Sequence, residues 1–154
     1  LPDMVMSQGT RTHQLAMFVA YESPVQMFSG NPSDAYPEIG FTTYLASLPT
    51  TWDDIRVLDA KLGDYLVVAR RKDNDWYLAA MTDWTAREIT VSLSFLADGK
   101  YRALSCEDGI NAAKDARDYS MGYRLIDNKE NLELKMAPGG GYVVKLIKLG
   151  DARP

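Results

Sequence analysis

Hydrophobic and polar residues follow two different periods along the chain, one before Pro49 and one after it. The large apolar side chains of residues 14–28 are too widely spread for one narrow stripe of a helix: Leu15, Phe18, Val19 and Tyr21 on one side, Met17 and Ala20 on the other. A helix that is apolar nearly all round is buried on several sides. The pattern predicts a helix over residues 14–28, with Ser7 and Thr10 as candidate N-caps and a break at Ser23-Pro24.

A second helix is expected over residues 37–48, where apolar residues recur at near-helical spacing around Gly40. After Pro49 the period becomes two. Residues 89–95 and 132–136 alternate apolar with polar side chains, which is typical of half-buried antiparallel strands. The alternation places four side chains toward a core and three toward solvent: inward Val91, Leu93, Val144 and Leu146, outward Ser92, Ser94 and Lys145.

Seven short strands are predicted in all, and strands at this close spacing favour an antiparallel β-sandwich. A compact polar turn, Lys72-Asp73-Asn74-Asp75, joins two of them into a hairpin. Residues 109–123 are polar and poor in strand-forming residues, so they are interpreted as a long connection. The expected strands cover residues 55–62, 65–71, 76–82, 89–95, 100–106, 132–136 and 142–149.

The chain is therefore expected to be mainly β, with a helical segment over residues 1–48 followed by a β-sandwich over residues 49–154. The helical segment is too small to build a complete core of its own. It also begins at Leu1, without a start methionine or a secretory signal. Both features indicate a fragment of a longer protein.

Composition narrows the class of protein. The chain has 154 residues, a net charge of −4 and 46% hydrophobic residues, which suits one ordinary folded domain. The sequence lacks the clustered basic residues that are typical of nucleic-acid binding. No apolar stretch approaches the length of a membrane span. The single cysteine, Cys106, cannot form an internal disulfide.

Residues with catalytic chemistry are few. His13 is the only histidine, and a structural hydrogen bond at a helix start explains it better than a role as a base. One histidine and one cysteine cannot build a zinc site from nitrogen and sulfur ligands alone. Paired carboxylates could serve as acid and base, but each cluster falls in a predicted turn or strand end and is interpreted as solvated: Asp53-Asp54, Asp73 with Asp75, and Glu107-Asp108.

Two further patterns also have a structural interpretation. Gly139-Gly140-Gly141 matches no phosphate-binding spacing, so it is expected to form a tight turn into the last strand. A sugar-stacking platform is the alternative for several aromatic residues, although the in-phase position of Trp76 favours the core. That aromatic set is Trp52, Trp76, Tyr77, Trp84 and Tyr101. The residues by themselves thus identify no active site.

Several segments together resemble glycoside hydrolase family 97. Residues 7–17 (SQGTRTHQLAM) and 21–27 (YESPVQM) are similar to the last helix of that family's catalytic barrel. The resemblance continues in order into the C-terminal β-sandwich through PTTWDD at 49–54, VLDAKLG at 57–63, ARRK at 69–72 and MTDW at 81–84.

This resemblance implies a C-terminal fragment of a bacterial exo-acting α-glycosidase, an α-glucosidase or α-galactosidase, often periplasmic. Such enzymes have an N-terminal β-super-sandwich, a (β/α)8 barrel and a C-terminal sandwich described as an oligomerisation domain. Their catalytic carboxylates and Ca²⁺ ligands lie in the earlier parts, so no catalytic or metal residue is assigned here. The fragment is expected to be inactive by itself, to bind the remainder of the parent glycosidase, and to self-associate.

Active sites of such barrels lie on the loops that lead into the helices. Ser7 and Gln8 precede the first helix and are therefore the expected substrate-proximal residues. Two alternatives stay open: a stand-alone carbohydrate-binding module, and an interaction domain unrelated to sugars.

Overall fold

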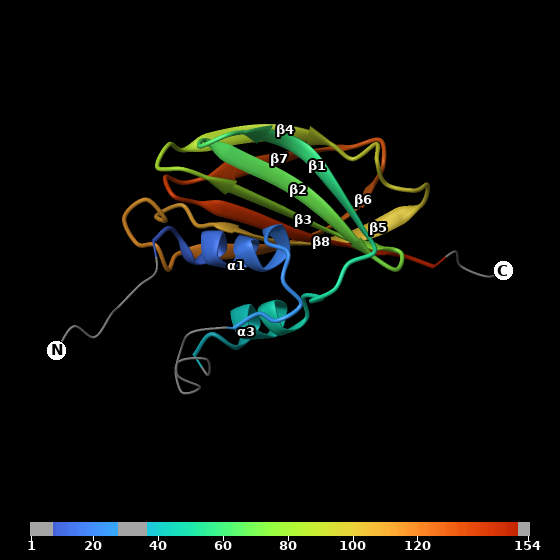
Figure 1. The fold of residues 1–154 in the computed structure, drawn as a ribbon, viewed down its shortest axis with the longest axis horizontal. Coiled ribbons are helices and arrows are strands. Elements are labelled where there is room, and N and C mark those ends of the chain that lie inside the picture. The colour runs from blue at the N-terminus through green and yellow to red at the C-terminus, as the bar shows by residue number, and fades with distance from the viewer. Residues whose placement is uncertain (1–7, 28–36, 151–154) are drawn as a thin grey trace.

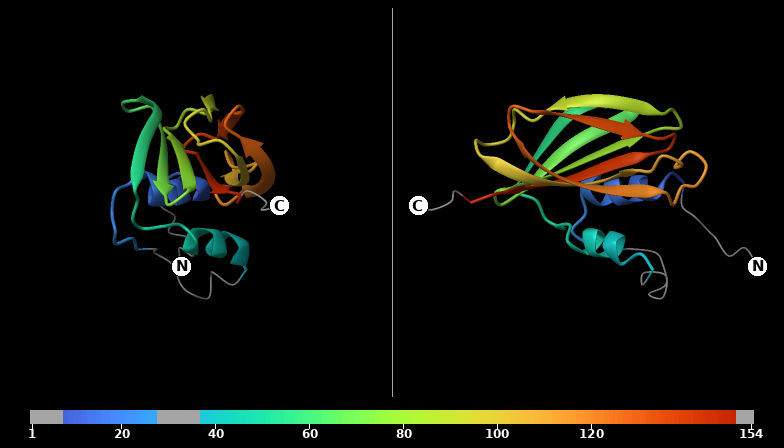
Figure 2. Two further views of the ribbon diagram at one scale, coloured as in Figure 1. Left: turned by 90° about the vertical axis from the view of Figure 1, so that its right-hand side faces the viewer. Right: turned by 180° about the vertical axis from the view of Figure 1, so that it is seen from behind.

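The chain folds into three layers, two of strands and one of helices (Figure 1). The structure, a computed structural model, describes residues 8–27 and 37–150. Figure 2 shows the two helices on one side of the large sheet and the small sheet on the other. The helices are α1 (Arg11–Ala20) and α3 (Ile39–Ala46). The strands are β1 (Asp54–Lys61), β2 (Tyr65–Lys72), β3 (Asp75–Thr82), β4 (Arg87–Ser92), β5 (Lys100–Asp108), β6 (Tyr119–Asp127), β7 (Asn131–Met136) and β8 (Gly141–Lys148).

All strand pairs in the described residues are antiparallel. Six strands form one sheet in the order β1-β2-β3-β8-β5-β6, and β4 pairs with β7 in a second sheet. The expected hairpin forms β2 and β3, with Lys72 opposite Asp75. Asp73 adopts a left-handed φ of 53° in its turn, a conformation that Asp tolerates better than most residues. The predicted antiparallel β-sandwich is confirmed, with eight described strands in place of about seven.

A sandwich core fills the space between the two sheets. The four side chains predicted to face inward, Val91, Leu93, Val144 and Leu146, all belong to it. Ser92 and Ser94 are exposed, as their phase requires. Trp76, whose phase favoured the core, is buried there, and Tyr101 is buried in the same core.

A second core lies between the large sheet and the helices. It combines the buried face of α1 (Leu15, Ala16, Val19) with side chains from the opposite face of β2, β3, β5 and β8. The large sheet is therefore apolar on both faces at its centre. This explains why residues 65–71 and 76–82 lack a clean alternation: their strands are covered on both sides.

Helix α1 starts where its sequence indicates. Thr10 is the N-cap, and its Oγ1 accepts a hydrogen bond from the backbone N–H of His13 at 3.1 Å. The helix ends at Ala20, earlier than predicted, because Tyr21 takes an extended conformation ahead of Ser23-Pro24. Arg70 is buried and donates from Nη2 to the carbonyl of Ala20 at 3.1 Å, which satisfies one of the helix's last carbonyls. Ser7 and Phe28 lie outside the described residues.

Strand β6 corrects the sequence interpretation. Residues 109–123 were expected to form one long connection, but the loop ends at Asp118 and the strand begins at Tyr119. Most of its side chains are exposed, because it is an edge strand with a neighbour on one side only. A strand with mostly exposed side chains lacks the apolar pattern by which a buried strand is predicted. The polar composition of residues 119–123 therefore led to the wrong prediction of a loop.

Lys145 is a second correction. Its phase in β8 predicted a solvent-facing position, yet it is only 6% exposed because α3 covers that part of the sheet. Its Nζ donates to the carbonyl of Tyr44 at 3.0 Å and to Oγ of Ser47, and lies 3.7 Å from the centroid of the Tyr44 ring. The Tyr44 hydroxyl in turn donates to the carbonyl of Leu104 at 2.7 Å. Lys145 and Tyr44 thus attach α3 to the sheet.

The Lys145 site predicts a pH-dependent stability. Burial lowers the pKa of Lys145 from 10.5 to about 8, so between these values the unfolded chain binds more protons than the folded one, and stability rises with pH. Below pH 8 the lowered pKa of Lys145 reduces the free energy of unfolding by at most about 3 kcal/mol. Lys145→Met keeps the apolar stem without the charge. Urea unfolding of both proteins should show wild type gaining stability relative to Lys145→Met from pH 7.5 to 9.5. If the difference in stability between the two proteins stays constant over this pH range, the pKa of Lys145 is not lowered by folding.

Candidate functional site

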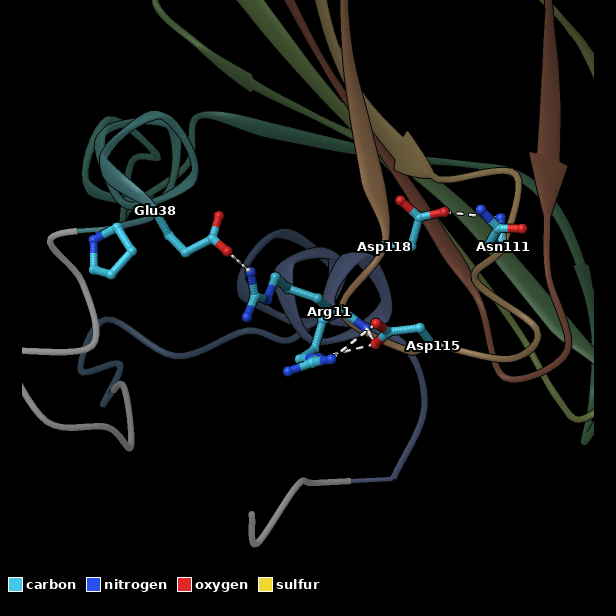
Figure 3. Close-up of a pocket in the computed structure, with 7 residues that line it drawn as sticks. Arg11, Glu38, Asn111, Asp115 and Asp118 are labelled. Atoms are coloured by element: carbon cyan, nitrogen blue, oxygen red, sulfur yellow. Dashed lines mark hydrogen bonds and ion pairs between the residues drawn. The ribbon is translucent and has the colours of Figure 1, made fainter. Parts of the chain in front are cut away.

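A polar pocket on the described surface lies between α1, α3 and the 109–118 loop (Figure 3). It measures about 550 Å³ and is open to solvent. Its lining residues are Arg11, Pro37, Glu38, Asn111, Asp115, Arg117 and Asp118. Two arginines and three carboxylates in one concave place are the natural first candidate for acid–base chemistry.

Four of the five charged side chains of this pocket form two ion pairs, and Asp118 accepts from the backbone N–H of Asn111 at 2.8 Å. Arg11 Nη1 lies 2.9 Å from Glu38 Oε1, and the Tyr119 hydroxyl donates to Glu38 Oε2 at 2.7 Å. The hydrogen bond from Tyr119, assisted by Arg11, lowers the pKa of Glu38. The Arg117 guanidinium holds Asp115 in a two-pronged pair, with Nε–Oδ1 and Nη2–Oδ2 both 2.9 Å. That pair lowers the pKa of Asp115 to about 2.

These pKa directions argue against glycosidase-type catalysis in the pocket. A general acid needs a carboxyl whose pKa is raised, whereas Glu38 and Asp115 are both shifted the other way. The contacts of Glu38 join separate elements instead: Arg11 starts α1, Glu38 precedes α3 and Tyr119 starts β6. Arg11 also stacks over Phe41 of α3 and over Tyr119, at 5.5 and 5.7 Å from the ring centroids. We interpret the pocket as a junction of the helical layer and the sheet.

Asp108, in contrast to Glu38 and Asp115, has a raised pKa. Burial raises its pKa, although hydrogen bonds from Thr10 and from the backbone N–H groups of Ala137 and Gly141 act against this. Its two oxygens are occupied by those three donors at 2.6–3.0 Å. A raised pKa suits a general acid, but a carboxyl with both oxygens engaged by its own chain has a structural task. The sequence interpretation of Asp108 as a solvated strand-end residue is therefore wrong.

The other predicted candidates have structural roles. His13 Nδ1 is hydrogen-bonded to the carbonyl of Gly140 at 3.0 Å. Asp53 accepts from the N–H of Asp73 at 2.7 Å, and Asp75 accepts from the N–H of Lys148 at 2.8 Å. Glu107 accepts a bond from the Ser120 hydroxyl at 3.3 Å. Asp53 and Asp54 line one open pocket together with Glu22 and Arg70, whereas Asp75 and Glu107 line neither this pocket nor the one at Arg11.

The aromatic residues do not form a common platform. Trp76 packs against Phe95 in the sandwich core, with ring centroids 5.0 Å apart. Trp52 packs against Tyr77 on the helix side, at 5.3 Å. Trp84 is exposed and lies over Gly139 in the turn before β8. Three tryptophans in three environments give no row on which a sugar chain could stack.

Metal-binding clusters and long apolar helices are both absent from the described residues. In residues 8–27 and 37–150, no three His, Cys, Asp or Glu side chains are placed to hold a metal ion, so these residues do not fit a Ca²⁺ site of their own. No helix in these two ranges is both long and apolar enough to span a bilayer. Gln8 is exposed, and its carbonyl accepts a hydrogen bond from Gln14 Nε2 at 2.6 Å.

Comparison with known proteins identifies a domain type. The model of the glycosyl-hydrolase 97 C-terminal, oligomerisation domain matches residues 51–147. A retaining alpha-galactosidase from Bacteroides thetaiotaomicron is 45% identical over 141 residues, which are 92% of this chain and 21% of that enzyme.

Solved structures agree with this. A glycoside hydrolase family 97 enzyme from Pseudoalteromonas sp. strain K8, in complex with acarbose, superposes with a TM-score of 0.88 at 35% identity over 93% of this chain and 23% of that one. A beta-arabinopyranosidase shares the fold, with a TM-score of 0.74 at 24% identity over 92% of this chain and 22% of that one. The chain thus spans roughly a fifth to a quarter of the length of these relatives.

Proposed function

Because this chain belongs to glycoside hydrolase family 97 and contains its C-terminal domain, we propose that it is the C-terminal part of an exo-acting α-glycosidase. In that enzyme it supports the catalytic barrel and contributes to oligomerisation, without taking part in the chemistry. Residues 1–48 are the end of the barrel in this proposal, and residues 49–154 are the accessory sandwich.

The observation that carries the proposal is the apolar surface on the helix side of the large sheet. Large apolar side chains are exposed at both edges of that face and beside the helices: Ile55 and Val57 on β1, Met121, Tyr123 and Leu125 on β6, Tyr21, Val25 and Met27 after α1, and Ile39 at the start of α3. Their phase in β1 and β6 is that of Val68 and Cys106, which belong to the helix-side core. Exposed apolar surface of this kind marks a protein–protein contact.

We propose two partners for this surface, each covering a different part of it. The remainder of the parent enzyme covers the helical layer, from which the chain continues toward the barrel. A second copy covers what the barrel leaves uncovered, in keeping with the oligomerisation role in the description of the family domain.

The substrate follows from relatives alone. The relative at 45% identity is named a retaining alpha-galactosidase, which supports an α-galactoside. The acarbose complex of the Pseudoalteromonas enzyme keeps an α-glucoside as the alternative. We propose that the parent enzyme binds Ca²⁺ through residues of its earlier domains. Ser7 and Gln8 stay our prediction for the substrate-proximal loop, and the periplasm for the location.

Two measurements test the proposal. The purified chain should hydrolyse neither p-nitrophenyl α-galactoside nor α-glucoside, whereas the full-length parent should hydrolyse at least one. Turnover by the purified chain that survives repurification and is abolished by changing Asp53, Asp73 or Glu107 would refute the non-catalytic role.

The second measurement is of association. Light scattering over a dilution series should show that the chain self-associates, since burial of apolar surface contributes about 25 cal/mol per Å². The double variant Val57→Glu with Tyr123→Glu should weaken association, while Glu133→Gln on the exposed side of β7 should leave it unchanged. A strictly monomeric wild-type chain would contradict the proposed contact surface.

A further inference from the structure

The N-terminus of α1 is held by a buried set of contacts that we call the α1 clamp: Thr10, Asp108 and the turn 139–141. Thr10 is 2% exposed, and its hydroxyl donates to Asp108 Oδ1 at 2.6 Å across 98 residues of sequence. Asp108 Oδ2 accepts from the N–H groups of Ala137 and Gly141, at 2.9 and 3.0 Å. One carboxylate thus joins the helix start, the end of β5 and the turn before β8.

Backbone contacts reinforce the clamp from two directions. The N–H of Thr10 donates to the carbonyl of Gly139 at 2.8 Å, and the N–H of Arg11 donates to the carbonyl of Ala116 at 2.7 Å. Gly141 has no room for a side chain, because a Cβ there would lie 2.7 Å from the backbone N and Cα of His13. The helix start therefore rests directly on the turn, backbone against backbone.

This anchoring exceeds what a helix start requires. An N-cap needs one side-chain acceptor for an N–H of the first turn, and Thr10 Oγ1 provides it for His13. Here two separate parts of the β-domain, the end of β5 with the loop after it and the turn before β8, hold the same turn of helix. Gly9, with a left-handed φ of 89°, passes so close to Gly139 that a Cβ would lie 2.8 Å from its carbonyl oxygen. The clamp thus determines the path of residues 8–10 as well as the position of α1.

We propose that Thr10 and Asp108 are positioning residues for the glycosidase reaction: through the α1 clamp, the C-terminal domain holds Gln8 and Gly9, directly before α1, in their substrate-binding position. The inference rests on the proposed function, in which α1 is the last helix of the barrel and Gln8 lies on the loop that enters it. Active sites of such barrels are formed by these loops. The accessory domain then acts on substrate binding without contributing a residue that touches the reacting atoms.

Steady-state kinetics of the full-length parent enzyme test the proposal. Thr10→Val keeps the shape of the side chain but removes both the hydrogen bond to Asp108 and the cap of His13. We expect kcat/KM for the aryl α-glycoside to fall about tenfold or more, mainly through KM, because the loop binds substrate and carries no catalytic carboxylate. Thr10→Ser, which keeps the hydroxyl, should restore KM. Hydrogen exchange of the peptide over residues 8–20 should rise in Thr10→Val alone.

Val91→Ala, in the sandwich core on the other side of the sheet, is the matched control for lost stability. Assayed well below its melting temperature, it should keep wild-type KM. Wild-type KM in Thr10→Val, or an equal rise in Val91→Ala, would overturn the positioning role and leave the proposed function intact. A wild-type parent without α-glycosidase activity would instead remove the proposed function, and with it the premise of the clamp's role.

Discussion

Leu93→Ala is expected to lower the free energy of unfolding by about 2–5 kcal/mol, the usual range for truncating a buried leucine. Leu93 follows directly after β4 and is 0% exposed in the core between the two sheets. Its N–H donates to the carbonyl of Glu130 at 3.1 Å, which keeps the backbone in place and prevents collapse into the space left by the side chain. Part of the cost is therefore the unfilled cavity.

Ser92→Ala is the control next to it. Ser92 is exposed, and its hydroxyl accepts only from the N–H of Ser94, at 3.2 Å near solvent. Water replaces that acceptor, so the change should cost less than about 0.5 kcal/mol. Urea unfolding of both variants at pH 7 measures the difference. Equal losses at the two positions would mean that the inward and outward faces of this segment are assigned wrongly.

Asp108→Ala is expected to cost about 3 kcal/mol or more. It leaves the Thr10 hydroxyl and the N–H groups of Ala137 and Gly141 without their acceptor. Each buried donor left unpaired costs about 1–3 kcal/mol, and the start of α1 loses its attachment to the sheet at the same time. Thermal or urea unfolding, together with hydrogen exchange of the α1 peptide, measures both effects.

Asp108→Asn separates the hydrogen bonds of this residue from its charge. The amide keeps an oxygen for the two N–H groups, and its nitrogen can donate to Thr10 Oγ1. Because burial raises the pKa of Asp108, the folded state does not favour the charge, and the loss in stability should be much smaller than for Asp108→Ala. Glu107→Ala, on the neighbouring residue, should cost under about 1 kcal/mol, since its partner Ser120 is exposed. Equal losses of stability for Asp108→Asn and Asp108→Ala would show that the hydrogen bonds of Asp108 are not what stabilises the start of α1.

Sequence periodicity identified most of the β-sandwich because each of those strands carries its own signal. A strand with one buried face alternates, as around Val91 and Leu93, and a strand covered on both faces is a continuous apolar run, as in residues 76–82. Local chemistry likewise indicated the hairpin at Asp73 and the cap at Thr10. These features depend on residues close in sequence, and a single chain displays them directly.

Which polar side chain matters was decided only by the tertiary structure. The local sequence does not distinguish Asp53, Asp73 and Asp108 from one another. Only Asp108 forms a hydrogen bond with a helix start 98 residues away. Lys145 alternates as an outward residue, and only the arrival of α3 buries it. The edge strand β6 has too little buried surface to show a period. The order of residues determined the strands, the cap and the family likeness, because short-range patterns record them. Contacts between distant segments determined the clamp, the buried lysine and the apolar helix-side surface, because burial and charge pairing depend on what covers a residue, and no local period records that.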